Sequence, residues 1–218
     1  NGTILVEVQG HVVQLVDVAT GASPLSPVTE VLAYGLPNGG RSPVQVDEGS
    51  VVVVRRSATS LYSISLLQVA HGNATTLWEN PLPETPYVNL KQAFFRTVNG
   101  VLFSAIVYSM GEAGQEPFFD YWIGYDVASG DMLYNISGQF TEVLGDVQPA
   151  GNLFAVVSLC DSHSGPFYFS GVLIGVGLPV WDFNVPQLQA RNSFLVLNNG
   201  TTAVMWGQAG WMTVNLLN

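Results

Sequence analysis

Charge is the scarcest property of this 218-residue sequence. Only 10% of the residues are charged, against about 25% in an average globular domain. Lys and Arg number six and Asp and Glu sixteen, so the formal net charge is −10. So few basic groups argue against binding to nucleic acid or to an anionic membrane surface, because both attract cationic proteins.

Cysteine and long apolar runs are scarce as well. Cys160 is the single cysteine, so the chain forms no internal disulfide, and its apolar neighbours favour a buried, inert thiol. No run of 18 apolar residues is present, so no membrane insertion is expected. Apolar residues still make up 48% of the chain, which excludes disorder. The sequence begins at Asn1 without an initiator Met or a signal peptide, which indicates a processed or partial chain.

A glycine-containing turn followed by a short apolar strand recurs along the chain. The intervals between these turns are 47, 51, 51 and 49 residues, and their glycines are Gly2, Gly49, Gly100, Gly151 and Gly200. Aliphatic, β-branched and aromatic residues alternate between the turns, and no amphipathic helical pattern is present. The regular interval indicates an internal repeat of β-strands.

Each repeat continues in the same order after its glycine turn. Second strands are expected at residues 12–18, 61–67, 121–127, 171–176 and 211–217. Turns such as Asp126-Val127-Ala128-Ser129-Gly130 follow, then strands with an aromatic residue at Trp78, Tyr134 and Trp181, and a fourth strand such as residues 93–98. Four short strands in about fifty residues are typical of a β-propeller blade. The predicted fold class is therefore all-β, a β-propeller of four-stranded antiparallel blades.

The unit at residues 100–134 resembles the repeat of the PQQ-like, or quinoprotein-type, propellers. That repeat runs through a hydrophobic strand, a Leu-Asp-x-x-Thr-Gly-like turn and a Leu-Trp pair. The first unit matches the turn at Asp17-Val18-Ala19-Thr20-Gly21, and the second keeps Leu77-Trp78 but has Gln68-Val69-Ala70-His71-Gly72 as its turn. The fourth keeps Val180-Trp181. The resemblance covers nearly the whole chain and implies blade architecture, not an activity.

Residues 1–218 are interpreted as one propeller domain or as part of one. Four units are complete, and the fifth, which begins near Gly200, stops after its second strand. The chain is expected to be part of a longer propeller, ahead of a small closed propeller or an open stack completed by another chain. Residues 211–217 are too apolar for a bare sheet edge. The expected protein partner there is a continuation of the same chain or a neighbouring subunit.

Four Asn-x-Ser/Thr sequons begin at Asn1, Asn73, Asn135 and Asn199. Attached glycan solubilises a protein without adding charge. These sites, together with the low charge, predict an N-glycosylated protein that is secreted or displayed at the cell surface. We expect glycan on at least two of them, and Asn135 is the weakest candidate because it follows Tyr134 within a predicted strand.

No catalytic, cofactor-binding or metal-binding residue is assigned from the sequence, and no cofactor is expected. The resembled quinoprotein dehydrogenases need basic contacts to their quinone, whereas this chain has one lysine, Lys91, and one basic pair, Arg55-Arg56. The carboxylates Glu112, Glu116 and Asp120 could form an acid–base pair or a calcium site, but a solvated loop is the favoured interpretation.

The histidines give no stronger indication of catalysis. Asp161-Ser162-His163 lacks a Gly-x-Ser-x-Gly elbow, and His11 and His71 fall in different units, far from any metal-ligand spacing. The predicted function is therefore an extracellular structural or protein-interaction scaffold within a larger assembly or filament. The alternative is a propeller enzyme, a quinoprotein-type oxidoreductase or a glycoside hydrolase, whose site lies outside this chain or is incomplete in it.

Overall fold

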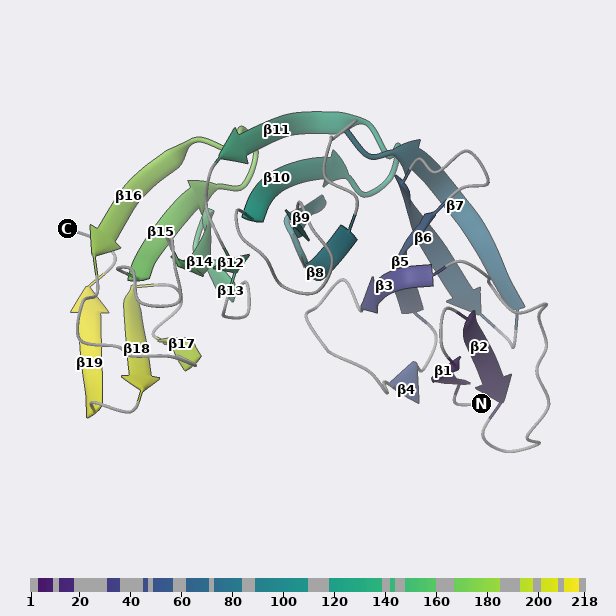
Figure 1. Ribbon diagram of the computed structural model, residues 1–218, viewed down its shortest axis with the longest axis horizontal. Coiled ribbons are helices and arrows are strands. Elements are labelled where there is room, and N and C mark those ends of the chain that lie inside the picture. The colour runs from purple at the N-terminus through teal and green to yellow at the C-terminus, as the bar shows by residue number, and fades with distance from the viewer. Residues whose placement is uncertain are drawn as a thin grey trace. The chain divides into compact units, whose positions relative to one another are not determined.

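The computed structural model describes 15 segments of the chain, namely residues 4–9, 12–17, 31–35, 45–46, 49–56, 62–70, 73–83, 89–109, 118–138, 142–143, 148–159, 167–184, 193–197, 201–207 and 210–215. Every regular element in them is a β-strand, and the strands pair antiparallel into five sheets (Figure 1). Within these segments no helix is long and apolar enough to cross a membrane. The all-β, antiparallel part of the predicted fold class is confirmed.

The chain divides into two compact units. Unit 1 is Asn1–Thr85 with Ala128–Gly130, and unit 2 is Pro86–Val127 with Asp131–Asn218. Unit 1 holds sheet 1, in the strand order β2-β1-β4, and sheet 2, in the order β3-β5-β6-β7. Their strands are β1 (Ile4–Gln9), β2 (Val12–Asp17), β3 (Val31–Gly35), β4 (Gln45–Val46), β5 (Gly49–Arg56), β6 (Tyr62–Ala70) and β7 (Asn73–Pro81).

Unit 2 holds three sheets. Sheet 3 has the order β11-β10-β9-β8, sheet 4 the order β12-β14-β15-β16 with β13 also on β14, and sheet 5 the order β17-β18-β19. Their strands are β8 (Asn89–Val98), β9 (Val101–Ser109), β10 (Phe118–Asp126), β11 (Met132–Gly138), β12 (Glu142–Val143), β13 (Gln148–Ala150), β14 (Leu153–Leu159), β15 (Phe167–Leu173), β16 (Pro179–Asn184), β17 (Ser193–Leu197), β18 (Thr202–Gly207) and β19 (Gly210–Asn215).

Apolar side chains cover both faces of the central strands. In β5 the consecutive residues Val51–Val54 are all buried, although neighbouring strand residues point to opposite faces. In unit 2 one core joins Phe103, Ala105 and Trp122 of sheet 3 to Val172 of β15 and Ile174 after it. Sheets that bury both faces account for the high apolar content, because each strand then reads as nearly continuous apolar sequence.

Two of the predicted glycine turns are observed as tight hairpins. Asn99-Gly100 joins β8 to β9 with φ of 50° and 77°, which is the left-handed pair that a type I′ turn requires. Gly151, with φ of 63°, opens the two-residue turn between β13 and β14. Gly49 is instead the first residue of β5, so the prediction of a turn there is wrong. Gly2 and Gly200 lie outside the described residues.

The strands predicted as the second of each repeat are observed close to their predicted residues, with one exception. The strand expected at residues 171–176 is β15, which ends at Leu173. Leu173 N donates to Leu178 O at 2.9 Å, and Gly177 N donates to Leu173 O at 2.8 Å. These two bonds close residues 174–177 into a turn, although the apolar Ile174 and Val176 continue the strand-like alternation.

Candidate functional site

Sheets 3 and 4 contain the same turn, held by the same backbone hydrogen bonds. After β10, Asp126 N donates to Asp131 O at 2.9 Å, and the neighbouring Val127 N donates to Gly100 O at 2.9 Å. After β15, Leu173 N donates to Leu178 O, and Ile174 N donates to Asn152 O at 3.1 Å. The second bond ties each turn to the hairpin that opens the preceding strand of its sheet. The turns are therefore structurally equivalent.

A glycine with positive φ stands at the same position in each turn. Gly130 has φ of 80° and Gly177 has φ of 70°, values that L side chains rarely adopt. A Cβ atom on Gly130 would lie 2.6 Å from Cγ of Trp78, and one on Gly177 would overlap the ring of Tyr134. Each glycine thus lets an aromatic ring lie directly on the backbone of the turn. Asn80 strengthens the first contact by donating its side-chain amide to Gly130 O.

The aromatic residues hold equivalent positions in their own sheets. Trp78 is opposite Leu66, Tyr134 is opposite Gly124 and Trp181 is opposite Gly171 in the strand pairing. The register shifts directly after each pair, which marks a β-bulge. The extra residues of the three bulges are Leu77, Leu133 and Val180, and all three are exposed apolar residues. Sequence reasoning missed the bulges, although the Leu-Trp-like pair that it recognised is their signal.

Tyr134 packs between two glycines, and its hydroxyl is buried. Its ring occupies the space that a Cβ would fill at Gly124, its cross-strand partner, as well as at Gly177. The hydroxyl of Tyr134 is buried without a hydrogen-bond partner, and burial raises its pKa above the ordinary value. The phenol therefore stays neutral, and its contribution is packing.

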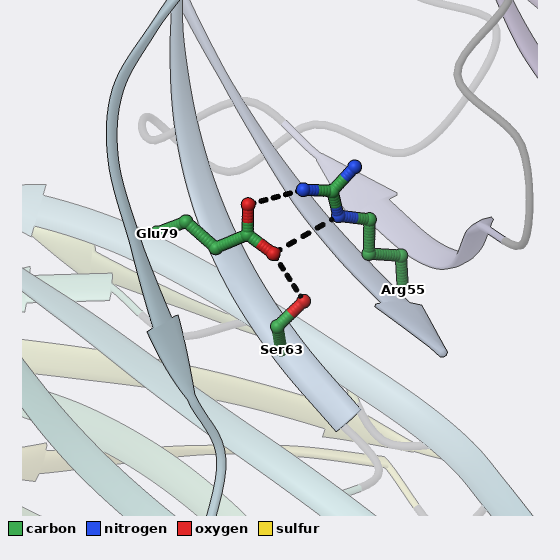
Figure 2. A network of polar contacts seen from close by, with 3 residues as sticks. All are labelled: Arg55, Ser63 and Glu79. Atoms are coloured by element: carbon green, nitrogen blue, oxygen red, sulfur yellow. Dashed lines mark hydrogen bonds and ion pairs between the residues drawn. The ribbon is translucent and has the colours of Figure 1, made fainter. Parts of the chain in front are cut away.

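A polar network ties three strands of sheet 2 together (Figure 2). Arg55 on β5 lies opposite Ser63 on β6, and Glu79 on β7 is diagonal to Ser63. Arg55 Nε donates to Glu79 Oε1 at 3.2 Å, Arg55 Nη2 makes an ion pair with Oε2, and Ser63 Oγ donates to Oε1 at 2.8 Å. The guanidinium and carboxylate are thus joined by two bonds, the two-point geometry that arginine favours.

The environment of Glu79 keeps its carboxylate ionised. Partial burial raises its pKa, but the hydrogen bonds from Arg55 and Ser63 and the charge of Arg55 outweigh burial, so the pKa is lowered. Both ends of the ion pair are more than one-third exposed. An exposed pair of this kind is worth about 0.2–1 kcal/mol. The network cross-links three strands of sheet 2.

The predicted glycosylation sites are only partly described. Asn135 is exposed on β11, an edge strand of sheet 3, and Asn73 is the first residue of β7, an edge strand of sheet 2. Asn1 and Asn199 lie outside the described residues. The structure therefore gives an accessible position for Asn135, the site that the sequence ranked lowest.

The other candidate residues are not brought together in the described segments. Asp120 lies in β10 and Lys91 in β8, and Arg56 is exposed beside Arg55. Most of the remaining candidates fall outside the description, namely Cys160, Glu112, Glu116, His11, His71, Asp161, Ser162 and His163. Among the described residues, no group of three or more His, Cys, Asp or Glu could hold a metal ion.

No protein-family model and no curated protein matches this chain. Solved structures do match: an acylaminoacyl peptidase from Pyrococcus horikoshii aligns with 95% of this chain at 9% identity and a TM-score of 0.52. A quinohemoprotein alcohol dehydrogenase from Pseudomonas putida aligns with 92% of it at 11% identity and a TM-score of 0.48. This chain spans 34% and 39% of those two chains. At 9% identity the likeness to the peptidase shows a shared fold alone.

Proposed function

We propose that this chain is a β-propeller, or part of one, built from repeats of the PQQ-like type. The observation that carries the proposal is the aromatic ring on the turn glycine, which occurs for Trp78 on Gly130 and for Tyr134 on Gly177. Equivalent turns, bulges and aromatic residues in successive sheets are expected of repeated blades. Trp78 and Gly130, which belong to the segments that carry the sequence resemblance, form the first of these contacts.

The proposed role is a structural or protein-interaction scaffold outside the cell. The aromatic residues that recur from sheet to sheet, Trp78 and Tyr134, pack against turns, and Trp122 fills the core. The polar network of Arg55, Ser63 and Glu79 is likewise committed to joining strands. A repeated framework with exposed outer strands suits the display of surfaces to other proteins. Other protein chains are the proposed partners, including one that covers β19, which among the described strands pairs with β18 alone.

Glycan on the edge strands β7 and β11 is the second part of the proposal. An edge strand exposes backbone groups that invite pairing with other chains, and bulky polar groups discourage such pairing. Sequons begin at Asn135 within β11 and at Asn73 at the start of β7, and both strands lie at an edge of their sheets. Glycan at these positions would solubilise a chain of low charge and protect two sheet edges.

Secretory expression in eukaryotic cells tests the glycoprotein proposal. Intact mass before and after enzymatic deglycosylation gives the glycan load, and peptide mapping assigns it to each sequon. Asn135→Gln and Ser137→Ala both abolish the sequon Asn135-Ile136-Ser137, so each should remove the same mass increment. Ile136→Val keeps this sequon and should retain that increment. Secreted protein with all four asparagines unmodified would overturn the proposal of an N-glycosylated scaffold.

A further inference from the structure

The tip of the hairpin between β8 and β9 holds an Asn-Gly pair. Asn99 and Gly100 are the two central residues of its type I′ turn, and both are exposed. Asn99 is the one described residue other than glycine that has positive φ. The ladder bonds of a two-residue hairpin are made by the flanking residues, here Val98 and Val101, so the N–H of Gly100 lies outside the ladder.

Asparagine is a chemically labile residue, and it is most labile when glycine follows it. The backbone nitrogen of the following residue attacks the side-chain carbonyl carbon of the asparagine, and a side chain on that residue hinders the approach. Glycine has no Cβ, and at Gly100 the space that a Cβ would occupy has no atom within 4 Å. The attacking nitrogen and the amide that it attacks therefore belong to adjacent residues in an exposed, uncrowded turn.

We propose that Asn99 is a site of spontaneous deamidation, with water as the co-reactant. Gly100 N loses its proton to solvent base and bonds to Cγ of Asn99, and the side-chain nitrogen leaves as ammonia. The product is a five-membered succinimide ring, which water then hydrolyses. Cleavage between Gly100 N and Cγ gives aspartate, whereas cleavage between Gly100 N and the backbone carbonyl carbon of residue 99 gives isoaspartate. In either product a carboxylate has replaced the amide.

The position of the pair at the hairpin tip makes the reaction accessible in the folded chain. Ring closure requires rotation about the backbone of Asn99, so the turn has to open first. Because Asn99 and Gly100 are already exposed, opening the tip uncovers little apolar surface. Local openings of such exposed segments are the least costly fluctuations of a folded protein.

The equivalent hairpin of sheet 4 has the same two residues in the opposite order. Gly151 and Asn152 are the central residues between β13 and β14, and both are exposed. Glycine with positive φ at the first central position fits a type II′ turn. Asn152 precedes Leu153, whose side chain hinders the attack and whose backbone belongs to the strand ladder. The fold thus accepts either order, and of these two turns the one at Asn99 is suited to deamidation.

Isoaspartate at residue 99 would disturb more than the tip of the hairpin. An isoaspartyl residue adds one carbon atom to the main chain, so a two-residue turn no longer matches the register of its strands. Gly100 O accepts the hydrogen bond from Val127 N at 2.9 Å, which ties this hairpin to the turn after β10. We expect the isoaspartyl product to lose this bond and the aspartyl product, whose main chain is unchanged, to keep it.

The test is ageing of the full chain in warm, neutral buffer made with heavy-oxygen water, followed by peptide mapping. Asn152 is the internal reference, since the other Asn-Gly pairs lie outside the described residues, namely Asn1-Gly2, Asn38-Gly39 and Asn199-Gly200. Asn99→Gly combined with Gly100→Asn reverses the pair, which copies the order found in sheet 4 and places Val101 after the asparagine. Circular dichroism and the unfolding midpoint check that this double variant folds.

The expected result is that aspartate and isoaspartate both appear at residue 99, labelled with heavy oxygen, at least about tenfold faster than any change at Asn152. The rate should rise with pH, because the attacking nitrogen has to lose its proton. The double variant should lose the fast reaction. In the isoaspartyl form, separated by chromatography, the amide of Val127 should exchange hydrogen at least about tenfold faster than in the variant Asn99→Asp.

Four results would count against the inference. Equal rates at Asn99 and Asn152, aspartate as the sole product, or an undiminished reaction in the double variant would each overturn the deamidation site. Unchanged hydrogen exchange at Val127 in the isoaspartyl form would overturn its coupling to the turn after β10. These measurements do not depend on the glycan load, so this inference and the proposed glycoprotein scaffold fail separately.

Discussion

Sheets 3 and 5 have similar apolar strands but opposite surroundings. In sheet 3 both faces of the central strand β9 are buried, since Leu102 and Ile106 on one face and Phe103 on the other are fully inaccessible. In sheet 5 one face buries Ala203 and Met205, while Trp206 and Trp211 on the other face are exposed, Trp211 by 75%. Alternating apolar residues therefore predict a strand but not whether anything covers each of its faces.

One pair of positions makes this contrast sharp. Ile106 and Trp206 each stand six residues after their repeat glycine, Gly100 and Gly200. Ile106 pairs across the strands with Tyr121, and Trp206 pairs with Trp211. The first pair is buried and the second is exposed. Substitutions at equivalent positions should therefore differ widely in cost.

The largest expected effect is that of Ile106→Ala. Truncation of a buried Ile leaves a cavity and costs about 2–5 kcal/mol of unfolding free energy. Trp206→Ala, at the equivalent exposed position, should cost less than ~1 kcal/mol. Urea denaturation of the two variants, followed by far-UV circular dichroism, measures both. Similar costs would mean that sheet 5 is covered in solution as sheet 3 is.

A second matched pair lies within one turn. Gly177→Ala puts a side chain at φ of 70° and into the Tyr134 ring, so we expect a loss of roughly 2–4 kcal/mol. Gly175→Ala meets nothing within 4 Å and should change stability by less than about 1 kcal/mol. Thermal and urea unfolding distinguish the two. A tolerated alanine at 177 would contradict the aromatic contact on which the propeller proposal rests.

The turn glycines and their aromatic contacts show which parts of the structure could be predicted from the sequence. The turn at 126–130 and the aromatic residue at 134 were predicted from local patterns, because turn chemistry and strand alternation are local. The partner of each aromatic ring could not be predicted, since Trp78 and Gly130 are far apart in sequence. The bulges were also missed, because one extra residue at Leu77 looks like continued alternation. The Arg55–Glu79 pair depends on strand register, which the sequence does not specify by itself.

The ion pair of sheet 2 gives a smaller effect with a defined pH dependence. Because the pKa of Glu79 is lowered from 4.5 on folding, its contribution is present above about pH 4.5 and is lost as the pH falls through the folded value. Glu79→Gln should cost about 0.2–1 kcal/mol at pH 7, and the difference from the unmodified chain should shrink in acid. Arg55→Gln should behave alike, whereas the exposed neighbour Arg56→Gln should have no such pH dependence.

The smallest expected change in stability comes from Trp211→Phe, yet this variant reports directly on the exposed face of sheet 5. Trp211 is 75% exposed and Trp122 is 3% exposed, so collisional quenching by acrylamide should reach the first and spare the second. In dilute solution Trp211→Phe should remove much of the quenchable emission, and Trp122→Phe should remove emission that resists quenching. Protection of Trp211 as the protein concentration rises would show that another copy covers this face. Quenching that stays constant with concentration would indicate that any chain that covers this face belongs to another protein. If Trp211 were protected from quenching even in dilute monomer, the contrast between sheets 3 and 5 would be contradicted.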